Sequence, residues 1–309
     1  MRRIFIALCL LAVTGVPQAN MSKPQLLAPG IISTPDDEVN AAISPDGGSL
    51  YFTKKAVRKN VIVVSQLVKG KWSIPEVASF SGRFSDIDPY FSSDGKQLFF
   101  CSNRPLEGDQ PKKDYDIWVV EKTRSGWSEP KNIGTSINTD SDEYYPAIAA
   151  DGTLYFSAMR PNGKGRFDLF RSQLIDGKYG EPENLSDLNS PTSEADCYIS
   201  PDQSFIVFAS YGRADGLGDG DLYISFNKGG SWTMPINLGA GVNSVAREYA
   251  PIGSPDGKTL LFTSERGFQD IAHEKPYTYG ELQTSMKSVE NGQGNIYRIE
   301  MSMITKKFR

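Results

Sequence analysis

The stretch Ala42-Ile43-Ser44-Pro45-Asp46-Gly47, followed by Leu50-Tyr51-Phe52, decides the fold of this chain. An alternating apolar run enters a Pro-Asp-Gly turn and a second apolar run leaves it, which is the pattern of a β-hairpin. The pattern returns at residues 90–100, 147–156, 198–208 and 251–262. Successive turn aspartates are 48, 57, 51 and 54 residues apart, at Asp46, Asp94, Asp151, Asp202 and Asp256. Such a period predicts the blades of a β-propeller, each too small to bury both of its faces alone.

Each repeat continues with further strand signals. A third strand is indicated at residues 61–64, 116–120, 168–170, 221–224 and 295–299. Four repeats add a fourth strand, marked by an aromatic residue three positions before a proline, at Trp72, Trp127, Tyr179 and Trp232. Proline suits an outermost strand because it has no N–H to donate to a neighbour. We therefore predict an all-β, five-bladed β-propeller of four-stranded antiparallel blades, with repeats at 37–85, 86–141, 142–193, 194–246 and 247–301.

The fifth repeat has no fourth strand of its own. Residues 24–32, ahead of the first repeat, are apolar and belong to no blade. We expect this segment to pair with the third strand of blade five, so that an N-terminal strand completes the last blade. Such closure removes the open edges of the ring. Residues 20–309 would then be a single propeller domain.

The first nineteen residues are predicted to be a signal peptide. Arg2 and Arg3 precede an apolar run over residues 4–16, and Ala19 is the expected cleavage point. The run is shorter than the roughly 20 residues that span a bilayer, so no membrane span is expected. The mature protein is then exported, to the periplasm or the extracellular medium. It keeps Cys101 and Cys197, which we place in non-neighbouring blades and expect to be free, buried thiols.

Composition narrows the classes of function. Glycine and proline together make up 48 of 309 residues (29 and 19), which favours turns and strands over helices. The formal net charge is −4, and no basic run or face is present, so a nucleic-acid partner is not expected. We predict that the protein is a monomer and that its partner is an envelope protein or a small ligand.

The repeat resembles the WD-like propeller repeats of the TolB family of bacterial envelope proteins. The resemblance rests on the Ser-Pro-Asp-Gly turns, on Asp116-Ile117-Trp118 and on Trp127-Ser128-Glu129-Pro130, and it covers residues 24–301. It implies a non-enzymatic, often protein-binding propeller outside the cytoplasm. The chain has no room for the additional N-terminal α/β domain of TolB, so the resemblance does not carry over TolB's particular partners.

Charged residues recur where strand one begins and strand two ends, which in a propeller is one face of the disc. Acidic residues begin strand one, and an arginine follows strand two in four blades. Charge-assisted pairs between the two sets would brace neighbouring loops. The alternative is a charged ring around the central funnel that receives a partner or ligand. The candidate binding residues of this face are Arg104, Arg160, Arg213, Arg266, Asp88, Glu143, Glu194 and Glu248.

The loop after Arg266 is the asymmetric element of the chain. It runs about 28 residues before the third strand of blade five and carries His273, Tyr277 and Tyr279, which are further candidates for binding. A short helix is expected from Tyr279 to Met286, with Thr278 as its cap. Long ordered loops on a rigid scaffold often bind partners. This loop either recognises a partner or only covers the funnel.

The sequence contains no recognised motif for catalysis, cofactor binding or metal binding. The sequence has no Gly-x-Ser-x-Gly elbow, no phosphate-binding Gly-Lys loop and a single histidine, so we assign no catalytic residue, no cofactor and no metal. Residues 225–232 resemble the Asp-box of sialidases, a hairpin device, and residues 215–221 read as a solvated turn rather than a calcium loop. The sequence therefore favours an exported, non-enzymatic binding scaffold. The alternative is a carbohydrate-active hydrolase, either a glycosidase or a sialidase-like enzyme, that uses carboxylates on the funnel face.

Overall fold

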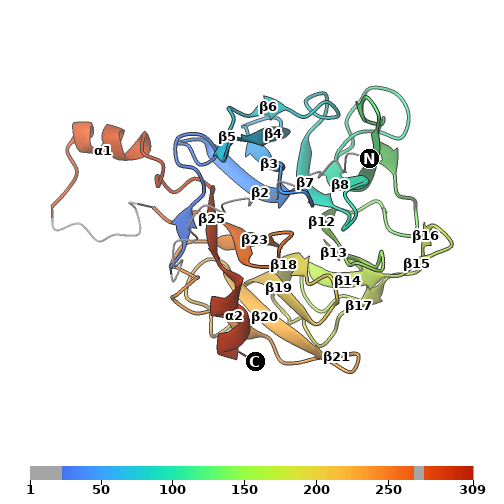
Figure 1. Ribbon diagram of the computed structural model, residues 1–309. Coiled ribbons are helices and arrows are strands. Elements are labelled where there is room, and N and C mark those ends of the chain that lie inside the picture. The colour runs from blue at the N-terminus through green and yellow to red at the C-terminus, as the bar shows by residue number, and fades with distance from the viewer. Residues whose placement is uncertain (1–22, 268–274, 309) are drawn as a thin grey trace, which may run out of the picture.

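The computed structural model describes residues 23–267 and 275–308, which form a five-bladed β-propeller (Figure 1). Each blade is an antiparallel sheet whose inner three strands follow one another in sequence, which confirms the predicted fold class. The inner three strands of blade one are β2 (Asp37–Ile43), β3 (Ser49–Lys55) and β4 (Val61–Val68), and those of blade two are β7 (Asp86–Phe91), β8 (Gln97–Ser102) and β9 (Asp116–Thr123). Blade three has β12 (Glu143–Ile148), β13 (Leu154–Ala158) and β14 (Asp168–Ser172), and blade four has β18 (Ser193–Ile199), β19 (Phe205–Tyr211) and β20 (Asp221–Lys228). Blade five has β23 (Glu248–Gly253), β24 (Thr259–Ser264) and β25 (Asn295–Glu300).

The outer strand of each of the first four blades is split in two around its proline. In blade one, β5 and β6 pair with successive parts of β4, and Pro75 lies between them. The proline has no N–H for the ladder, so pairing stops at it and resumes beyond it. In blade three the first piece pairs with the separate strand β15 (Leu174–Ile175). The split strands are β5 (Lys71–Trp72) and β6 (Glu76–Val77), β10 (Gly126–Trp127) and β11 (Lys131–Asn132), β16 (Lys178–Tyr179) and β17 (Glu183–Asn184), and β21 (Ser231–Trp232) and β22 (Ile236–Asn237).

In every turn between strands one and two, the aspartate accepts a hydrogen bond from the amide two residues later, and in blades one, two and five it also accepts from a serine hydroxyl two residues earlier. In blade one, Asp46 accepts hydrogen bonds from the Ser44 hydroxyl (2.5 Å) and the Gly48 amide (2.9 Å), while Gly47 takes a positive φ of 71°. Blade four has Gln203 at the glycine position, and it adopts φ 56°. A positive φ costs little for glycine and more for other residues, which explains the recurrent Asp-Gly pair. We call the side of the disc that carries these turns the turn face.

The N-terminal segment closes the ring. β1 (Gln25–Leu26) pairs antiparallel with β25 and supplies the outer strand of blade five. Behind it the Leu27 amide donates to the Ile296 carbonyl at 2.8 Å, and both Leu27 and Ile32 are buried. Closure by an N-terminal strand is therefore confirmed, although the paired part is only two residues long.

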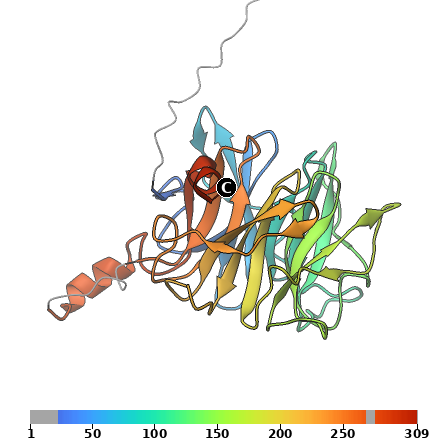
Figure 2. The same ribbon diagram turned by 90° about the horizontal axis from the view of Figure 1, so that it is seen from below.

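Two helices accompany the strands. α1 (Tyr279–Met286) begins at the predicted cap Thr278. α2 (Met301–Phe308) was not foreseen in the sequence, and it buries Met301 and Ile304 beside β24 and β25. Figure 2 shows α2 on the upper side of the disc and α1 leaving from the lower side. Among the described residues, no helix is long and apolar enough to cross a membrane.

Cys101 and Cys197 are both free and buried, as predicted. Cys101 lies on β8 in blade two and Cys197 on β18 in blade four. They belong to different sheets, as expected.

Candidate functional site

The face opposite the turns is organised by one buried carboxylate per blade. Each carboxylate lies at the start of strand one and is fully buried, and each forms an ion pair with a cation of the same blade. In blades two to five the cation is the arginine after strand two, and in blade one it is Lys54 near the end of strand two. We call this side of the disc the brace face. The pairs are Glu38 with Lys54 (2.9 Å), Asp86 with Arg104 (2.7 Å), Glu143 with Arg160 (3.8 Å), Glu194 with Arg213 (2.9 Å) and Glu248 with Arg266 (3.1 Å).

Each carboxylate also holds the loop before its own strand. Glu248, for example, accepts from the Ser244 amide and hydroxyl, both at 2.6 Å, and from the Ser264 hydroxyl at 2.6 Å. Thr34, Thr139 and Ser190 make the same pair of bonds to Glu38, Glu143 and Glu194. Both oxygens of these carboxylates are therefore used within the blade.

The arginines are equally engaged. Arg266 donates to the Val242 carbonyl at 2.6 Å and stacks over the Tyr297 ring, 4.9 Å from its centroid. Arg104, Arg160 and Arg213 repeat this arrangement on a carbonyl of the preceding loop and on aromatic rings, three for Arg104 and two each for Arg160 and Arg213. A guanidinium held by a carboxylate, a carbonyl and ring faces is a structural brace. This geometry agrees with bracing, the first of the two interpretations of the charged pattern.

Blade three carries the weakest brace. Ala158 stands where blades two, four and five have Ser102, Ser210 and Ser264, whose hydroxyls accept from the arginine Nε. Without that hydroxyl, Arg160 Nε is buried with no hydrogen-bond partner in the described chain. Burial raises the pKa of Glu143 to about 7, against the lowering effect of its hydrogen bonds from Thr139.

The centre of the disc is built from a β-bulge in strand one of every blade. The bulged residues all adopt a positive φ, between 50° and 57°, and they are Asn40, Asp88, Tyr145, Asp196 and Ala250. Three of their amides donate to a strand-two hydroxyl of the preceding blade: Asn40 to Thr263, Asp88 to Thr53 and Asp196 to Ser157. These bonds tie neighbouring blades together at the axis.

Asp88 and Asp196 serve the two bulges that lack such a hydroxyl. For Tyr145, the equivalent strand-two position of the preceding blade is Cys101, and for Ala250 it is Ala209. Neither residue has a hydroxyl. The Tyr145 amide donates instead to Asp88 Oδ2 at 3.1 Å, and the Ala250 amide bonds Asp196. The sequence placed Asp88 among the residues that pair with arginine, but Arg104 bonds Asp86, and Asp88 instead accepts from the Asn40 amide group.

Both central carboxyl groups have raised pKa values. Burial, with repulsion from Asp196, raises the pKa of Asp88 to about 8. Burial raises the pKa of Asp196 to about 6, and its hydrogen bond from Ala250 opposes that shift. Asp88 is 4% exposed, whereas Asp196 is only partly buried, so Asp196 is the more accessible of the two. Proximity to a second carboxylate makes the charged form of either group less stable.

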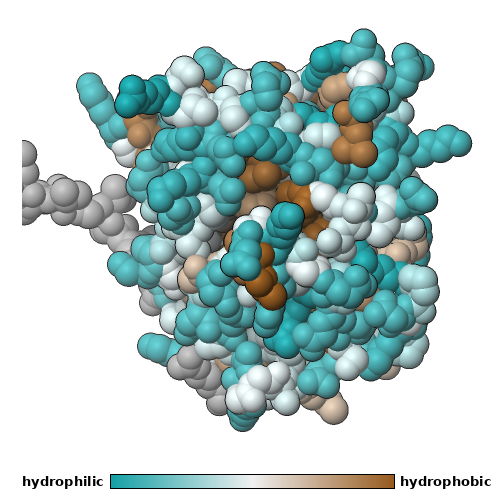
Figure 3. Space-filling view, turned by 90° about the vertical axis from the view of Figure 1, so that its right-hand side faces the viewer, coloured by the Kyte–Doolittle hydropathy of each residue, from teal (hydrophilic) through white to brown (hydrophobic). Residues whose placement is uncertain are grey.

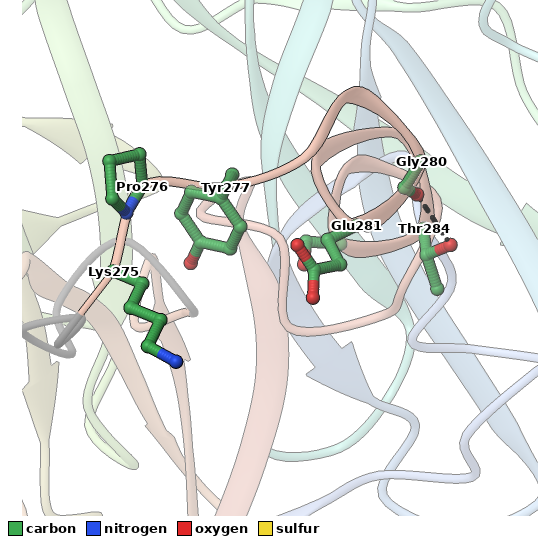
Figure 4. A pocket seen from close by; sticks show the side chains of 7 residues that line it. Lys275, Pro276, Tyr277, Gly280, Glu281 and Thr284 are labelled. Atoms are coloured by element: carbon green, nitrogen blue, oxygen red, sulfur yellow. Dashed lines mark hydrogen bonds between the residues drawn. The ribbon is translucent and has the colours of Figure 1, made fainter.

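The long loop of blade five extends beyond the disc. α1 lies well away from the blades in both ribbon views (Figures 1 and 2) and buries none of its residues. Thr278 and Glu281 form a reciprocal capping box at its first turn. Tyr277 and Glu281 line an open cavity of about 820 Å³ between the helix and the residues that precede it, Lys275 and Pro276 (Figure 4). His273 lies outside the described residues.

Figure 3 shows one side of the disc, where apolar (brown) side chains gather among polar (teal) ones. Between blades two and three a groove of about 540 Å³ is lined by Phe99, Val119, Ile133, Leu174 and Tyr179, with polar residues at its edge. Leu174 and Tyr179 come from the β15–β16 hairpin of blade three, which forms a separate two-stranded sheet.

The two segments that resembled ligand motifs are local turns. Asn227 accepts from the Gly230 amide at 2.8 Å in the hairpin between β20 and β21. Asp221 accepts from the Leu217 amide and from Asn237, which closes the 215–221 loop on itself. Across residues 23–267 and 275–308, no group of three histidine, cysteine or acidic side chains is placed to hold a metal ion.

No protein-family model and no curated protein sequence matches the chain. Among solved structures, an α-L-arabinofuranosidase from Lactobacillus brevis is similar with a TM-score of 0.56 and 12% identity, over 87% of this chain and 92% of that one. A TolB candidate from Agrobacterium tumefaciens has a TM-score of 0.50 and 15% identity, over 86% and 91%. TolB from Acinetobacter baumannii has a TM-score of 0.47 and 15% identity over 86% of this chain, which spans about half (54%) of that protein's length.

These likenesses establish the fold alone. The propeller is shared with a TolB candidate and with arabinofuranosidases, which differ in function, and the identities are 15% or lower. One fold hosts many functions, so the function has to be argued from the residues of this chain.

Proposed function

We propose that this protein is an exported, non-enzymatic binding module of the cell envelope and that its recognition element is the loop carrying α1. The observation that carries the proposal is an ordered helix without a single buried residue, held away from a rigid closed disc. Isolated helices of this length are marginal in water, so a helix that finds no packing on its own domain gains most from packing on a partner.

The helix offers a surface suited to another protein. Tyr279, Leu282 and Met286 are spaced as i, i+3 and i+7 and so share one side of α1. Tyr279 is 74% exposed and Met286 59% exposed. Aromatic residues and methionine are enriched at protein interfaces, and tyrosine is among the residues that often carry most of the binding energy. The partner chemistry that fits is an apolar groove on an envelope protein.

A photocrosslinking experiment tests this function. A photoreactive phenylalanine analogue is placed at position 279, or at Val57 on the equivalent loop of blade one, which is fully exposed. After exposure to an envelope extract, we expect a discrete crosslinked species only from position 279. The double variant Tyr279→Ala/Met286→Ala should lose most of the capture, and Val57→Ala/Leu106→Ala, on equivalent loops, should keep it. Equal capture by both double variants would remove α1 as the recognition element.

The competing function, carbohydrate hydrolysis, needs two carboxyl groups that face substrate with different protonation states. The five carboxylates of the brace face are instead bonded within their own blades. We expect no turnover of chromogenic glycosides or natural polysaccharides. Hydrolysis that Asp196→Asn abolished would establish the enzyme instead.

A further inference from the structure

The centre of the turn face holds a small apolar cavity, on the opposite side of the disc from α1. Its volume is about 220 Å³. Strand one of four blades contributes a large apolar residue at the same position, namely Ile43, Phe91, Ile148 and Ile199, and blade five contributes Gly253. A fivefold ring of apolar side chains thus has one gap.

The gap is filled by a neighbouring tyrosine. A Cβ atom on Gly253 would lie 2.3 Å from the ring and the hydroxyl of Tyr198, so no residue larger than glycine fits without moving that ring. Tyr198 therefore rests on the Gly253 backbone inside the cavity wall.

Two tyrosines that line this cavity have hydroxyls without a hydrogen-bond partner among the described residues. Tyr90 and Tyr198 both line it and are only 7% and 6% exposed. Neither hydroxyl makes a hydrogen bond to any residue in the described ranges, whereas the equally buried Tyr145 hydroxyl donates to the Pro251 carbonyl at 3.0 Å. Neither oxygen is among the fully buried side-chain atoms left without a partner in the described chain, so both hydroxyls are open to the cavity and can accept a hydrogen bond from a bound donor.

The mouth of the cavity is strongly acidic. The lining residues Pro45, Ser93, Pro201 and Pro255 are each followed by an exposed turn aspartate, and blade three adds Asp151. Hydrogen bonds from the turn lower the pKa of Asp94 to about 2 and lower those of Asp46, Asp202 and Asp256. Only Lys96 and Lys258 form ion pairs with this group among the described residues. The rim therefore carries negative charge throughout the physiological pH range.

We propose that this cavity, the axial pocket, binds the side chain of an arginine or lysine on a polypeptide partner. The aliphatic stem would contact the ring of Ile43, Phe91, Ile148 and Ile199. The cationic head would donate to the Tyr90 and Tyr198 hydroxyls and lie beside aromatic faces, an arrangement that favours cations. Basic residues flanking the inserted side chain would face the aspartates of the rim. The site is separate from α1, so its failure leaves the proposed function untouched.

The test uses the mature chain labelled with ¹³C at isoleucine methyl groups. The probe is a capped hexapeptide that alternates arginine and glycine, compared with hexapeptides in which glutamate or leucine replaces arginine. We expect saturable shifts of the Ile43, Ile148 and Ile199 methyl signals with the arginine peptide, weakened by added salt. Ile62 and Ile117, buried inside blades, serve as internal references.

Variants assign the interaction to the axial pocket. Tyr198→Phe keeps the ring against Gly253 and should weaken binding about five-fold through the lost hydroxyl. Asp94→Asn/Asp202→Asn should weaken it about three-fold or more, while Asp140→Asn/Asp219→Asn, equally exposed but on the brace face, should not. Ile43→Trp should fill the mouth and abolish binding.

Three results would overturn the proposal. The first is the absence of saturable shifts with the arginine peptide while the thermal midpoint shows a folded protein. The second is equal binding of the leucine peptide, which would make the occupant apolar. The third is equal loss of binding in the two double aspartate variants, which would reduce the effect to net charge.

Discussion

At the scale of single residues, the charged positions of this propeller divide into satisfied and unsatisfied groups. The acid at the start of strand one receives bonds from the loop before it and from the cation after strand two, so it joins three segments of one blade. Each such bond is worth roughly 1 kcal/mol or more because the partner is charged. The pattern recurs because every blade has to fasten the same loops.

The incomplete brace of blade three can be repaired. Ala158→Ser places a hydroxyl where Ser210 and Ser264 have one, within reach of the unpartnered Arg160 Nε. We expect the variant to gain about 0.5–1.5 kcal/mol in the free energy of unfolding. Urea denaturation measures it, with Ser210→Ala as the reciprocal variant that should lose a similar amount. A loss of stability in Ala158→Ser would mean that the site has no room for the hydroxyl.

Asp88 should make folding stability fall as pH rises. Its folded pKa of about 8 lies above the ordinary value of 3.8, so between those pH values the folded chain holds a proton that the unfolded chain has released. Its contribution is therefore complete below about pH 4 and is lost progressively as the pH rises to 8.

The variant Asp88→Asn removes this titration but can keep an acceptor for the Tyr145 amide. We expect the difference in stability between pH 5 and pH 8 to shrink in the variant, as measured by urea denaturation at several pH values. An unchanged slope would show that Asp88 is ionised in the folded protein at pH 5.

At the scale of elements, a short strand, β1, and a short helix, α2, attach the two ends of the described chain to blade five. β1 has two residues in its ladder, yet Leu27 and Ile32 behind it are buried and carry most of its attachment. α2 covers the other end of β25 through Met301 and Ile304. Both ends of the described part of the chain are therefore fixed to blade five.

Deletion of residues 24–32 should destabilise the whole disc. Loss of two buried aliphatic side chains costs about 2–5 kcal/mol each. At about 2–4 °C per kcal/mol for a chain of this size, the thermal midpoint should fall by well over 5 °C. Calorimetry of the truncated mature protein checks this expectation. A midpoint within about 2 °C of the intact protein would contradict the closure model.

At the scale of the whole molecule, the closed ring should open as one unit. Bonds at the axis join each bulge to the blade before it, and β1 links the first repeat to the last. A ring without a free edge has no terminal blade that could unfold first.

The two buried thiols report on that cooperativity. Cys101 and Cys197 lie in blades two and four, and burial raises the pKa of both thiols, which slows alkylation. We expect both to react at the same rate in urea, set by global unfolding, and mass spectrometry of alkylated peptides measures each rate. Faster reaction of one thiol would reveal a blade that opens alone.

Much of the architecture was determined by the sequence itself. Strand alternation, the Asp-Gly turns and a period near 50 residues specify local hairpins, and local hairpins of that size can only bury their faces by stacking in a ring. The capped helix after Thr278 was equally readable because a capping box is a local device. The missing outer strand of blade five, together with an apolar segment lacking a blade, implied closure.

Tertiary structure alone decided what the central residues do. Asp86, not Asp88, pairs with Arg104 because a β-bulge turns Asp88 toward the axis, and a bulge leaves no signature in alternating hydrophobicity. The axial pocket depends on Gly253, which makes room for Tyr198 from another blade, and on turns that are far apart in sequence. Contacts between blades arise from the packing of residues some 50 positions apart, and no local pattern encodes them.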